Sequence, residues 1–459
     1  MKINERDNVE VNLENGHKYA VRDIAAGEYI IKYGCPIGHA SEAIKTGEWV
    51  HTHNLKTNLD GILDYSYKPH ACRVPAAPER NGFMGYLRKD GTAGIRNDLW
   101  IINTVGCVNK LAERLAAQSG VKHFPHPFGC SQLGGDQRVT QQILKGMVQH
   151  PNAGGVLVLG LGCENNHLGV FREILGEIDE NRVKFLNAQD CGDEIGEGLR
   201  LLEELDNFRS RCSRQKLPLS HLRVGLKCGG SDGYSGITAN PLVGRVSDLL
   251  TASGASTILT EVPEMFGAET QLMNRCESRG VFDKCVRMVN GYKNYFLRHN
   301  QAVYENPSPG NKAGGITTLE EKSLGCVQKS GFAPVVDVLD YGDTVTKPGL
   351  NLLNGPGNDL VAITNLMAAG AQLILFTTGR GTPVGSAVPT LKIATNSVLA
   401  DKKPHWIDFD AGRLLSGMPM DEAAMQLYSL VLDTAEGRKT RNEENGYEEI
   451  SIFKDGVTL

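Results

Sequence analysis

Along the first 70 residues, hydrophobic positions alternate with polar ones in short runs that are broken by glycine. Val9, Val11 and Leu13 alternate in this way, and Asn15-Gly16 follows them as a turn. Short alternating runs with glycine between them are typical of small β-rich domains such as compact barrels. We therefore expect residues 1–70 to form a small β-rich module.

From residue 82 onward, continuous apolar runs alternate with segments of helical periodicity. The runs have the length of buried strands. They are Leu99–Val105, Val156–Gly160, Val183–Leu186, Leu222–Leu226, Thr257–Leu259, Val335–Leu339, Gln372–Phe376 and Leu391–Thr395. Helical segments such as Gln137–Val148 and Asp359–Ala369 lie between them. Strands that alternate with helices predict parallel sheets with helices on both faces, so we expect a multi-domain α/β protein.

Polar stretches without periodicity indicate where the domains divide. Residues 71–81 contain prolines and read as a linker, and the polar stretch Arg209–Pro218 reads as a second boundary. The sequence thus predicts an α/β domain at residues 82–215 and a C-terminal α/β domain at residues 216–459.

The composition narrows the class of protein. The chain has 41% hydrophobic and 22% charged residues and a net charge of −5, as in soluble globular proteins without a basic surface for nucleic acid. No apolar run is long enough to cross a membrane, and the polar N-terminus lacks the apolar core of a signal peptide. We expect a cytoplasmic protein that binds neither nucleic acid nor membranes, and a homo-oligomer remains open.

Eleven cysteines are scattered along the chain without a CxxC pair. This pattern argues against a disulfide framework and against a zinc ribbon. A free cysteine is usually a small buried hydrophobic residue. Several of these cysteines, however, lie in or beside glycine-rich turns, namely Cys107, Cys130, Cys163, Cys228 and Cys326.

The segment Gly225–Gly244 carries the densest chemistry. A strand ends there in Lys227 and Cys228, and two glycines, Ser231 and Asp232 follow before the next helix. A strand, a glycine-rich polar turn and a helix form a ligand site in many α/β proteins. The simpler interpretation is an ordinary loop with a buried cysteine. We favour a site, because similar polar turns follow the other strands.

Motifs for nucleotides are absent, since no GxGxxG follows the first strand and GxxxxGK[ST] does not occur. The turns instead suit a small polar molecule. Arg380 and Lys312 can pair with a carboxylate, and hydroxyl and amide groups can bind the hydroxyls of a sugar. The predicted substrate-binding residues are Ser231, Lys312, Thr378, Arg380, Thr382 and Asn396.

Loss of water from a hydroxy acid is a reaction that suits such a site. A base takes the α-proton, an acid protonates the departing hydroxide, and a divalent metal stabilises the enediolate. Lys227, Asp232, His126 and His167 are the candidates for the acid and the base, and the sequence does not rank them. A structural role is an equal alternative for each of them.

Histidines of the first module are candidate metal ligands. His51 and His53 are two residues apart, so on a strand they would share a face. The alternative is a pair of surface histidines. The full set of predicted metal ligands is His17, His51, His53, Cys130, Cys163 and Glu164.

Several stretches fall in the order found in one enzyme family over residues 10–400. They include GEWVHTHNLKTNL, GYLRKDGTAGIRN, HPFGCSQLGGD, KCGGSDGYSGITANP, EVPEMFGAE, GNKAGGITTLEEKSLGC and FTTGRGTPVGSAVPTLKIATN. In these stretches the chain resembles the altronate/galactarate dehydratase family. The resemblance implies an SAF-type N-terminal module joined to an α/β body. It also implies a sugar-acid substrate that loses water to give a 2-keto-3-deoxy acid, with iron(II) (Fe²⁺) as the metal and manganese(II) (Mn²⁺) as a substitute.

Within this family, the segment Gly47–Leu59 favours D-altronate over galactarate, with 2-dehydro-3-deoxy-D-gluconate as the product. Three alternatives stay open. A related enzyme could act on galactarate or on another 2-hydroxy acid such as sulfolactate, and a non-catalytic sensor could bind a sugar acid without turnover. A third is an iron–sulfur cluster held by Cys130, Cys163, Cys228 or Cys326, which the lack of a local C-x₂-C-x₂-C spacing disfavours.

Overall fold

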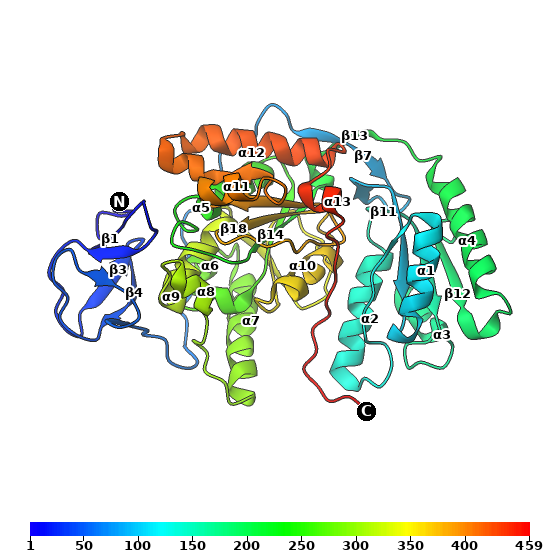
Figure 1. The fold of residues 1–459 in the computed structure, drawn as a ribbon, viewed down its shortest axis with the longest axis horizontal. Coiled ribbons are helices and arrows are strands. Elements are labelled where there is room, and N and C mark those ends of the chain that lie inside the picture. The colour runs from blue at the N-terminus through cyan, green and yellow to red at the C-terminus, as the bar shows by residue number, and fades with distance from the viewer.

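A computed structural model describes the whole chain, residues 1–459. The chain forms a β module, an α/β domain and a larger α/β domain. The N-terminal module and the second domain lie at opposite ends of the molecule, with the C-terminal domain between them (Figure 1). The predicted fold class is confirmed. None of the helices combines the length and the apolar character needed to cross a membrane.

The N-terminal module consists of two three-stranded antiparallel sheets, β1-β2-β5 and β3-β4-β6. The strands are β1 (Val9–Val11), β2 (Lys18–Ala20), β3 (Tyr29–Lys32), β4 (Cys35–Ala40), β5 (Trp49–Val50) and β6 (Leu55–Lys56). The alternation in the sequence buries Val9 and Val11 and leaves Glu10 exposed between them.

The second domain is built on a parallel sheet with the order β10-β9-β11-β12. Its strands are β9 (Asp98–Asn103), β10 (Lys122–His123), β11 (Ala153–Gly160) and β12 (Val183–Asn187). Its helices are α1 (Asn109–Ser119), α2 (Gly134–Val148), α3 (Leu168–Leu175) and α4 (Glu194–Arg209), with 3-10 turns η1 (Gly106–Val108) and η2 (Ala188–Asp190). A small antiparallel sheet of β13 (Gln215–Pro218), β7 (Gly82–Leu87) and β8 (Ala93–Gly94) brings the two ends of this part of the chain together.

The C-terminal domain contains a seven-stranded parallel sheet with the order β16-β17-β15-β14-β18-β19-β20. Its strands are β14 (Arg223–Cys228), β15 (Ser256–Leu259), β16 (Val335–Leu339), β17 (Gly349–Leu353), β18 (Leu373–Thr378), β19 (Thr390–Ala394) and β20 (Phe409–Asp410). Its α-helices are α5 (Ala239–Ala252), α6 (Glu269–Met273), α7 (Arg279–Arg298), α8 (Pro309–Ala313), α9 (Leu319–Cys326), α10 (Asp359–Ala368), α11 (Ser397–Lys402), α12 (Met420–Ala435) and α13 (Arg441–Asn445). Its 3-10 turns are η3 (Leu219–His221), η4 (Val262–Met265), η5 (Val327–Ser330) and η6 (Ala411–Ser416).

The strand order of the large sheet reverses at β14. The strands β15 to β17 lie on one side of it and β18 to β20 on the other. The loops that follow the strands on the two sides diverge at such a reversal, which creates a crevice at the carboxyl ends of the strands. The turn that follows β14, within Gly225–Gly244, therefore lies at this crevice.

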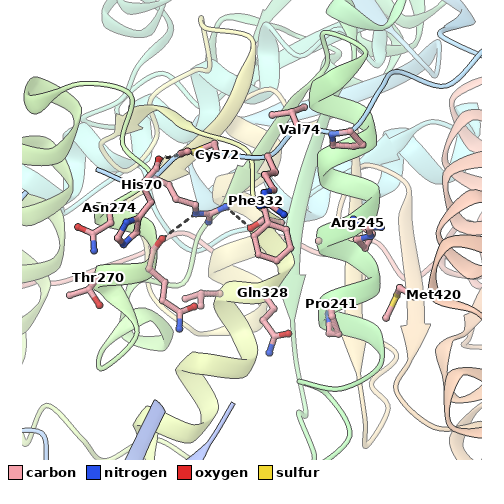
Figure 2. Close-up of a pocket in the computed structure, with 18 residues that line it drawn as sticks. His70, Cys72, Val74, Pro241, Arg245, Thr270, Asn274, Gln328, Phe332 and Met420 are labelled. Carbon is pink, nitrogen blue, oxygen red and sulfur yellow. Dashed lines mark hydrogen bonds between the residues drawn. The ribbon is translucent and has the colours of Figure 1, made fainter. Parts of the chain in front are cut away.

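The segment between β6 and β7 has no helix or strand, and it crosses the C-terminal domain as a strap. The Tyr67 hydroxyl donates a hydrogen bond to the carbonyl of Cys276 (2.6 Å), and the His70 N–H donates one to the carbonyl of Asn274 (2.9 Å). A groove of about 870 Å³ lies between the strap, α5 and Phe332 (Figure 2). It contains none of the predicted site residues.

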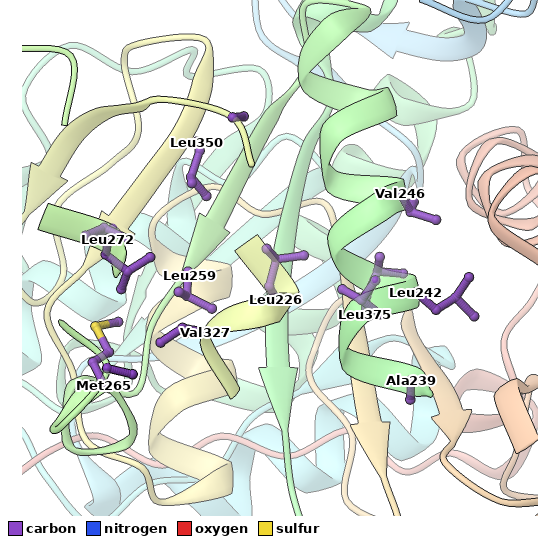
Figure 3. Close-up of a cluster of buried hydrophobic side chains, with 14 of the residues drawn as sticks. Leu226, Ala239, Leu242, Val246, Leu259, Met265, Leu272, Val327, Leu350 and Leu375 are labelled. Carbon is purple, nitrogen blue, oxygen red and sulfur yellow. The ribbon is translucent and has the colours of Figure 1, made fainter. Parts of the chain in front are cut away.

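The module and the C-terminal domain share one hydrophobic core. At the centre of the large sheet, Leu242 of α5 belongs to the same buried cluster as Leu226 and Leu375 (Figure 3). Ile30 and Val50 of the module belong to this cluster too. The module is therefore packed against the body.

A second buried cluster joins the two α/β domains. It includes Ile143 and Met147 of α2 together with Ile363 and Leu366 of α10. Gly146 of α2 lies so close to Ala368 that a Cβ atom at this glycine would be 2.5 Å from the Ala368 carbonyl oxygen. The two α/β domains thus form one packed body.

Candidate functional site

Buried polar side chains gather where β14, β15 and α9 end. β14 ends in Lys227 and Cys228, and α9 ends in Cys326. Glu261 follows β15 and Glu264 lies in η4. Each of the five residues is at most 5% exposed, although they come from three distant segments of the chain.

Two thiols and one carboxylate form the centre of this group. Cys228 Sγ lies 3.4 Å from Cys326 Sγ, and Glu264 Oε2 lies 3.1 Å and 3.2 Å from the two sulfur atoms. No other three His, Cys, Asp or Glu ligand atoms in the protein lie within 4.8 Å of one another. We call these three residues the thiol–carboxylate site.

Buried lysines neutralise the negative charge of the acidic groups. The Lys322 ammonium donates to Glu264 (2.8 Å), and Lys227 donates to Glu261 and to Asp359 (2.9 Å). Burial of a charged group costs several kcal/mol of desolvation free energy, and the attraction of an oppositely charged partner offsets only part of this cost. So many buried charges are a poor source of stability, and they favour a functional role for the site.

The backbone at Glu261 is strained. Its φ of 72° and ψ of 57° lie in the left-handed region, which residues other than glycine occupy at a cost of about 1–3 kcal/mol. The Glu261 carboxylate accepts a hydrogen bond from the N–H of Cys228 (3.1 Å) and lies 3.7 Å from the Lys329 ammonium. These contacts hold the strained conformation. Strain of this kind is common at functional sites.

The two thiols share a proton unequally. The hydrogen bond that Cys326 donates to Cys228 lowers the pKa of Cys228 to about 6, although burial alone would raise it. The same hydrogen bond, together with burial, raises the pKa of Cys326 well above its ordinary value. The pair therefore holds one thiolate readily, and thiolate is the form that binds metals.

The ammonium group of Lys227 stays charged. Burial would lower its pKa, but the carboxylates of Glu261 and Asp359 raise the pKa above its ordinary value. A lysine in this state can donate a proton or stabilise negative charge, and it is poorly suited to remove one.

Asp232 is tied by hydrogen bonds on both carboxylate oxygens. It accepts from Thr395 (2.9 and 3.0 Å), from Ser235 (3.0 Å) and from Asn396 (3.0 Å). Its main visible role is thus to join the loops that follow β14 and β19, and burial raises its pKa. Of the four predicted acid and base residues, Lys227 is the one that contacts the buried acidic cluster.

The predicted substrate-binding residues lie on neighbouring loops. The N–H of Arg380 donates to the carbonyl of Gly230 (2.9 Å), and the Thr378 hydroxyl accepts from Gly381 N–H (2.9 Å). The exposed side chain of Arg380 makes no ion pair. The Thr382 hydroxyl accepts from Val384 N–H (3.3 Å). Loops after β14 and β18 thus hold each other in place.

Lys312 approaches these loops from α8. The side chain of Asn311 donates to the carbonyl of Ser231 (2.8 Å), which fixes α8 next to the turn after β14. The structure thus brings together the segments of Ser231, Lys312, Thr378, Arg380 and Asn396.

The remaining predicted residues of the second domain lie at the carboxyl ends of β9 and β11. His126 is buried, with Nε2 against the carbonyl of Asn103 (2.9 Å) and Nδ1 accepting from Phe128 N–H (3.2 Å). The Glu164 carboxylate accepts from the Thr104 hydroxyl (2.6 Å) and from two N–H groups of its own turn. Both side chains have structural partners. His167, Cys130 and Cys163 lie on adjacent turns outside the thiol–carboxylate site.

The predicted metal histidines do not lie on a strand. β5 ends at Val50, so His51 and His53 stand in the turn that follows, and the argument from a shared strand face is wrong. The rings of His17 and His51 lie 5.7 Å apart beside Trp49. His51 Nε2 bonds the carbonyl of Lys312 (2.9 Å) and His53 is exposed. Of these histidines, His51 lies at the junction between the module and α8.

Sequence comparisons identify the family. The profile of the C-terminal domain of D-galactarate/altronate dehydratases matches residues 219–458, and that of the second domain of D-galactarate dehydratase/altronate hydrolase matches residues 85–207. The profile of the altronate/galactarate dehydratase SAF domain matches residues 1–58.

The chain belongs to the altronate/galactarate dehydratase family.

Relatives within this family match almost the whole chain. It is 52% identical to the altronate dehydratase of Bacillus subtilis (strain 168) and 52% identical to that of Escherichia coli (strain K12), each over 98% of this chain and 93% of the relative. The galactarate dehydratase (L-threo-forming) of Escherichia coli (strain K12) is 34% identical, over 96% of this chain and 90% of the relative.

In this member of the altronate/galactarate dehydratase family, the thiol–carboxylate site has the donors of a site for a divalent transition metal. Thiolate sulfur and carboxylate oxygen both serve as ligands of divalent transition metals. The buried position of Cys228, Glu264 and Cys326 and their mutual distances fit one shared ion. None of the predicted metal ligands is part of this group.

Glu261 and Glu264 are not among the predicted site residues, and the sequence does not indicate that Cys326 lies beside Cys228. A signal was present, because two carboxylates follow the strand Thr257–Leu259 directly and flank Val262-Pro263. Their distance to Cys326 depends on the packing of α9 and could not be read from the sequence.

Proposed function

We propose that this protein is a hydro-lyase that removes water from D-altronate and forms 2-dehydro-3-deoxy-D-gluconate. The supporting observation is the 52% identity, over 98% of the chain, with altronate dehydratases of two bacteria. The galactarate enzyme is much less similar, at 34% identity.

The reaction breaks the C2–H bond and the C3–O bond of the sugar acid. A base removes the C2 proton, and the electron pair of that bond forms the C2=C3 double bond. The C3 hydroxyl leaves with a proton as water. The resulting enol takes a proton at C3, loses the proton of its C2 hydroxyl and becomes the 2-keto acid, so the reaction consumes no oxidant or reductant.

The pair of Lys227 and Asp359 fits the two proton transfers. The Asp359 side chain is 36% exposed, whereas Lys227 is fully buried, and their charged groups lie 2.9 Å apart. Asp359 thus faces the side from which substrate can enter. Asp359 takes the C2 proton, and the charged Lys227 protonates the departing hydroxide. Glu261 holds Lys227 in place from the buried side.

The metal that we assign to the thiol–carboxylate site is iron(II), with manganese(II) as a weaker substitute. Cys228, Glu264 and Cys326 would hold it. Once bound there, a divalent metal would supply a Lewis acid that stabilises the negative charge that develops on the substrate.

The substrate carboxylate pairs with Arg380 and Lys312, and the sugar hydroxyls bind Ser231, Thr378, Thr382 and Asn396. The exposed, unpaired guanidinium of Arg380 supports this assignment, because a bidentate partner is available to a carboxylate there.

The test is an assay of the purified protein with iron(II) and a thiol on a panel of aldonic and aldaric acids. The 2-keto-3-deoxy acid product is measured by a colorimetric reaction. We expect altronate to exceed galactarate in kcat/KM by at least about tenfold, which corresponds to about 1.4 kcal/mol. A preference for galactarate, or tight binding of altronate without product, would contradict the proposal.

A further inference from the structure

Helix α9 carries one buried carboxylate that two lysines of the N-terminal module neutralise. Glu321 Oε2 lies 2.8 Å from the Lys18 ammonium, and Glu321 Oε1 lies 2.7 Å from that of Lys32. The three side chains are about 1% exposed. Lys18 also donates to the carbonyl of Gly315 (3.0 Å). Because these charges are out of water, removal of either side would leave the other buried without a partner, which is costly.

Two other residues of α9 and its N-cap, Glu320 and Thr318, add hydrogen bonds to the same junction. Glu320 accepts hydrogen bonds from the Thr57 hydroxyl (2.9 Å) and from the N–H of Asn58 (2.6 Å). The Thr318 hydroxyl, at the N-cap of α9, donates to the carbonyl of Ile37. Contacts thus come from β2, β3, β4 and the segment that follows β6.

Apolar packing continues across this junction. Ile30, Ile37 and Leu55 of the module share one buried cluster with Leu319 and Leu324 of α9. A junction with a continuous core, buried ion pairs and matched hydrogen bonds has the character of a permanent protein–protein interface. Within the strap after β6, Thr57 and Asn58 take part in this junction, whereas Ile62 and Leu63 are exposed.

The same short helix builds the thiol–carboxylate site. All eight residues of α9 are buried. Lys322 pairs with Glu264, and Cys326 lies one turn further along and contacts Glu264 and Cys228. Glu320 and Glu321 thus face the module, whereas Lys322 and Cys326 of the same helix face the site.

We propose that the N-terminal module is a non-covalently docked subunit of the body, and that its contacts with Glu320 and Glu321 hold α9 so that Cys326 stays in the thiol–carboxylate site. The partner that this surface of α9 fits is a β module with two buried lysines, as in residues 1–58 of this chain. The covalent link through Ile62 and Leu63 is not needed to hold the module in place.

The experiment uses the full chain with a protease recognition sequence inserted between Ile62 and Leu63. After cleavage, the two fragments should elute together from a size-exclusion column at physiological salt. The labelling rate of Cys326 by iodoacetamide, measured by peptide mass mapping, should stay as slow as in the uncleaved protein. If the two fragments of the cleaved, unsubstituted protein elute separately, the proposal is overturned.

Glu321→Gln in the same cleavable chain removes the charge that both lysines need. After cleavage we expect the module to dissociate and Cys326 to be labelled at least about tenfold faster, because α9 then opens locally. The exposed Glu177→Gln is the matched control and should behave like the unsubstituted protein. Loss of the module with an unchanged labelling rate of Cys326 would show that α9 holds its place alone, and would overturn the proposal.

If Glu321→Gln does not fold, Lys32→Met provides the second variant, because Glu321 keeps Lys18 as its partner. We expect the module to dissociate partly after cleavage. The labelling rate of Cys326 should rise in proportion to the fraction of protein that has lost the module. Full retention of the module with this variant would contradict a role for the ion pairs. The labelling needs no substrate, so its outcome is independent of the reaction.

Discussion

The sulfur atoms of Cys228 and Cys326 lie 3.4 Å apart, although 98 positions separate the two residues in the chain. One thiol ends the central strand of the large sheet, and the other ends a helix that the N-terminal module holds. A carboxylate oxygen of Glu264 completes a triangle with them, 3.1 Å from one sulfur atom and 3.2 Å from the other. The thiol pair thus connects the central strand with a helix that also contacts the N-terminal module.

Cys326→Ser should weaken metal binding by more than about 100-fold, because a ligand is lost from a set of three. The measurement is the iron or cobalt content after dialysis against a limited free metal concentration. Cys107→Ser, at an exposed thiol of the second domain, is the control and should bind as the unsubstituted protein does. If His51→Ala and His53→Ala lose the metal while Cys326→Ser keeps it, the histidines are the ligands instead.

Asp359→Asn should lower kcat by about 10²–10⁴-fold, since the amide cannot accept the C2 proton. The fold should survive, because this side chain is partly exposed and Lys227 keeps Glu261 as a partner. Steady-state kinetics on altronate and the melting temperature give the two readouts. Asp401→Asn, at an exposed position of α11, is the matched control. Unchanged kcat in Asp359→Asn would remove this residue from the proton transfer.

Arg380→Ala should raise KM for altronate by at least about tenfold, because a charge-assisted pair with the carboxylate is worth about 1.5–3 kcal/mol. The stability should change little, since the guanidinium is exposed and makes no ion pair. Arg287→Ala, at an exposed position of α7, should leave KM unchanged. Equal KM values in the two variants would place Arg380 outside the substrate site.

The stability of the junction between the two α/β domains should fall in acid because of His150. Its Nε2 lies 3.1 Å from the carbonyl of Ala371 in the C-terminal domain, and its Nδ1 accepts from Asn152 N–H (3.1 Å). Burial, and to a lesser extent nearby arginines, lowers the pKa of His150 to about 3 from an ordinary 6.5.

Between pH 6.5 and about 3 the unfolded chain therefore binds a proton at His150 that the folded chain does not bind. The free energy of unfolding should decrease as the pH falls through this window, by up to about 1.4 kcal/mol per pH unit. Urea unfolding at pH 7.5, 6.5 and 5.5 measures the slope. His150→Gln should be less stable at pH 7.5 but should show a shallower slope, and an equal slope in both proteins would exclude His150 as the cause.

Much of the fold could be predicted from the sequence because buried parallel strands are continuous apolar runs. The strand predicted at Leu222–Leu226 is β14, and the polar turn that follows it lies at the reversal of the sheet. The helix predicted at Asp359–Ala369 is α10, which ends one residue earlier, at Ala368.

The centre of the site was harder to predict, because its members meet only through tertiary packing. Cys228, Glu264 and Cys326 have no common spacing in the sequence, so no local motif connects them. His51 and His53, which do have a regular spacing, turned out to lie in a turn. Local periodicity therefore located the strand ends but not the partners across them.

The two lysines that meet Glu321 limit which modules can replace the present one. A β module from a relative that lacks a basic residue at either position would bury an excess negative charge on α9. Hybrid enzymes made by exchange of the first 58 residues should therefore assemble when the incoming module carries both lysines, or when Glu321 is replaced as well. In evolution, the same requirement links changes in the module to changes in a helix that begins about 260 residues further along the chain.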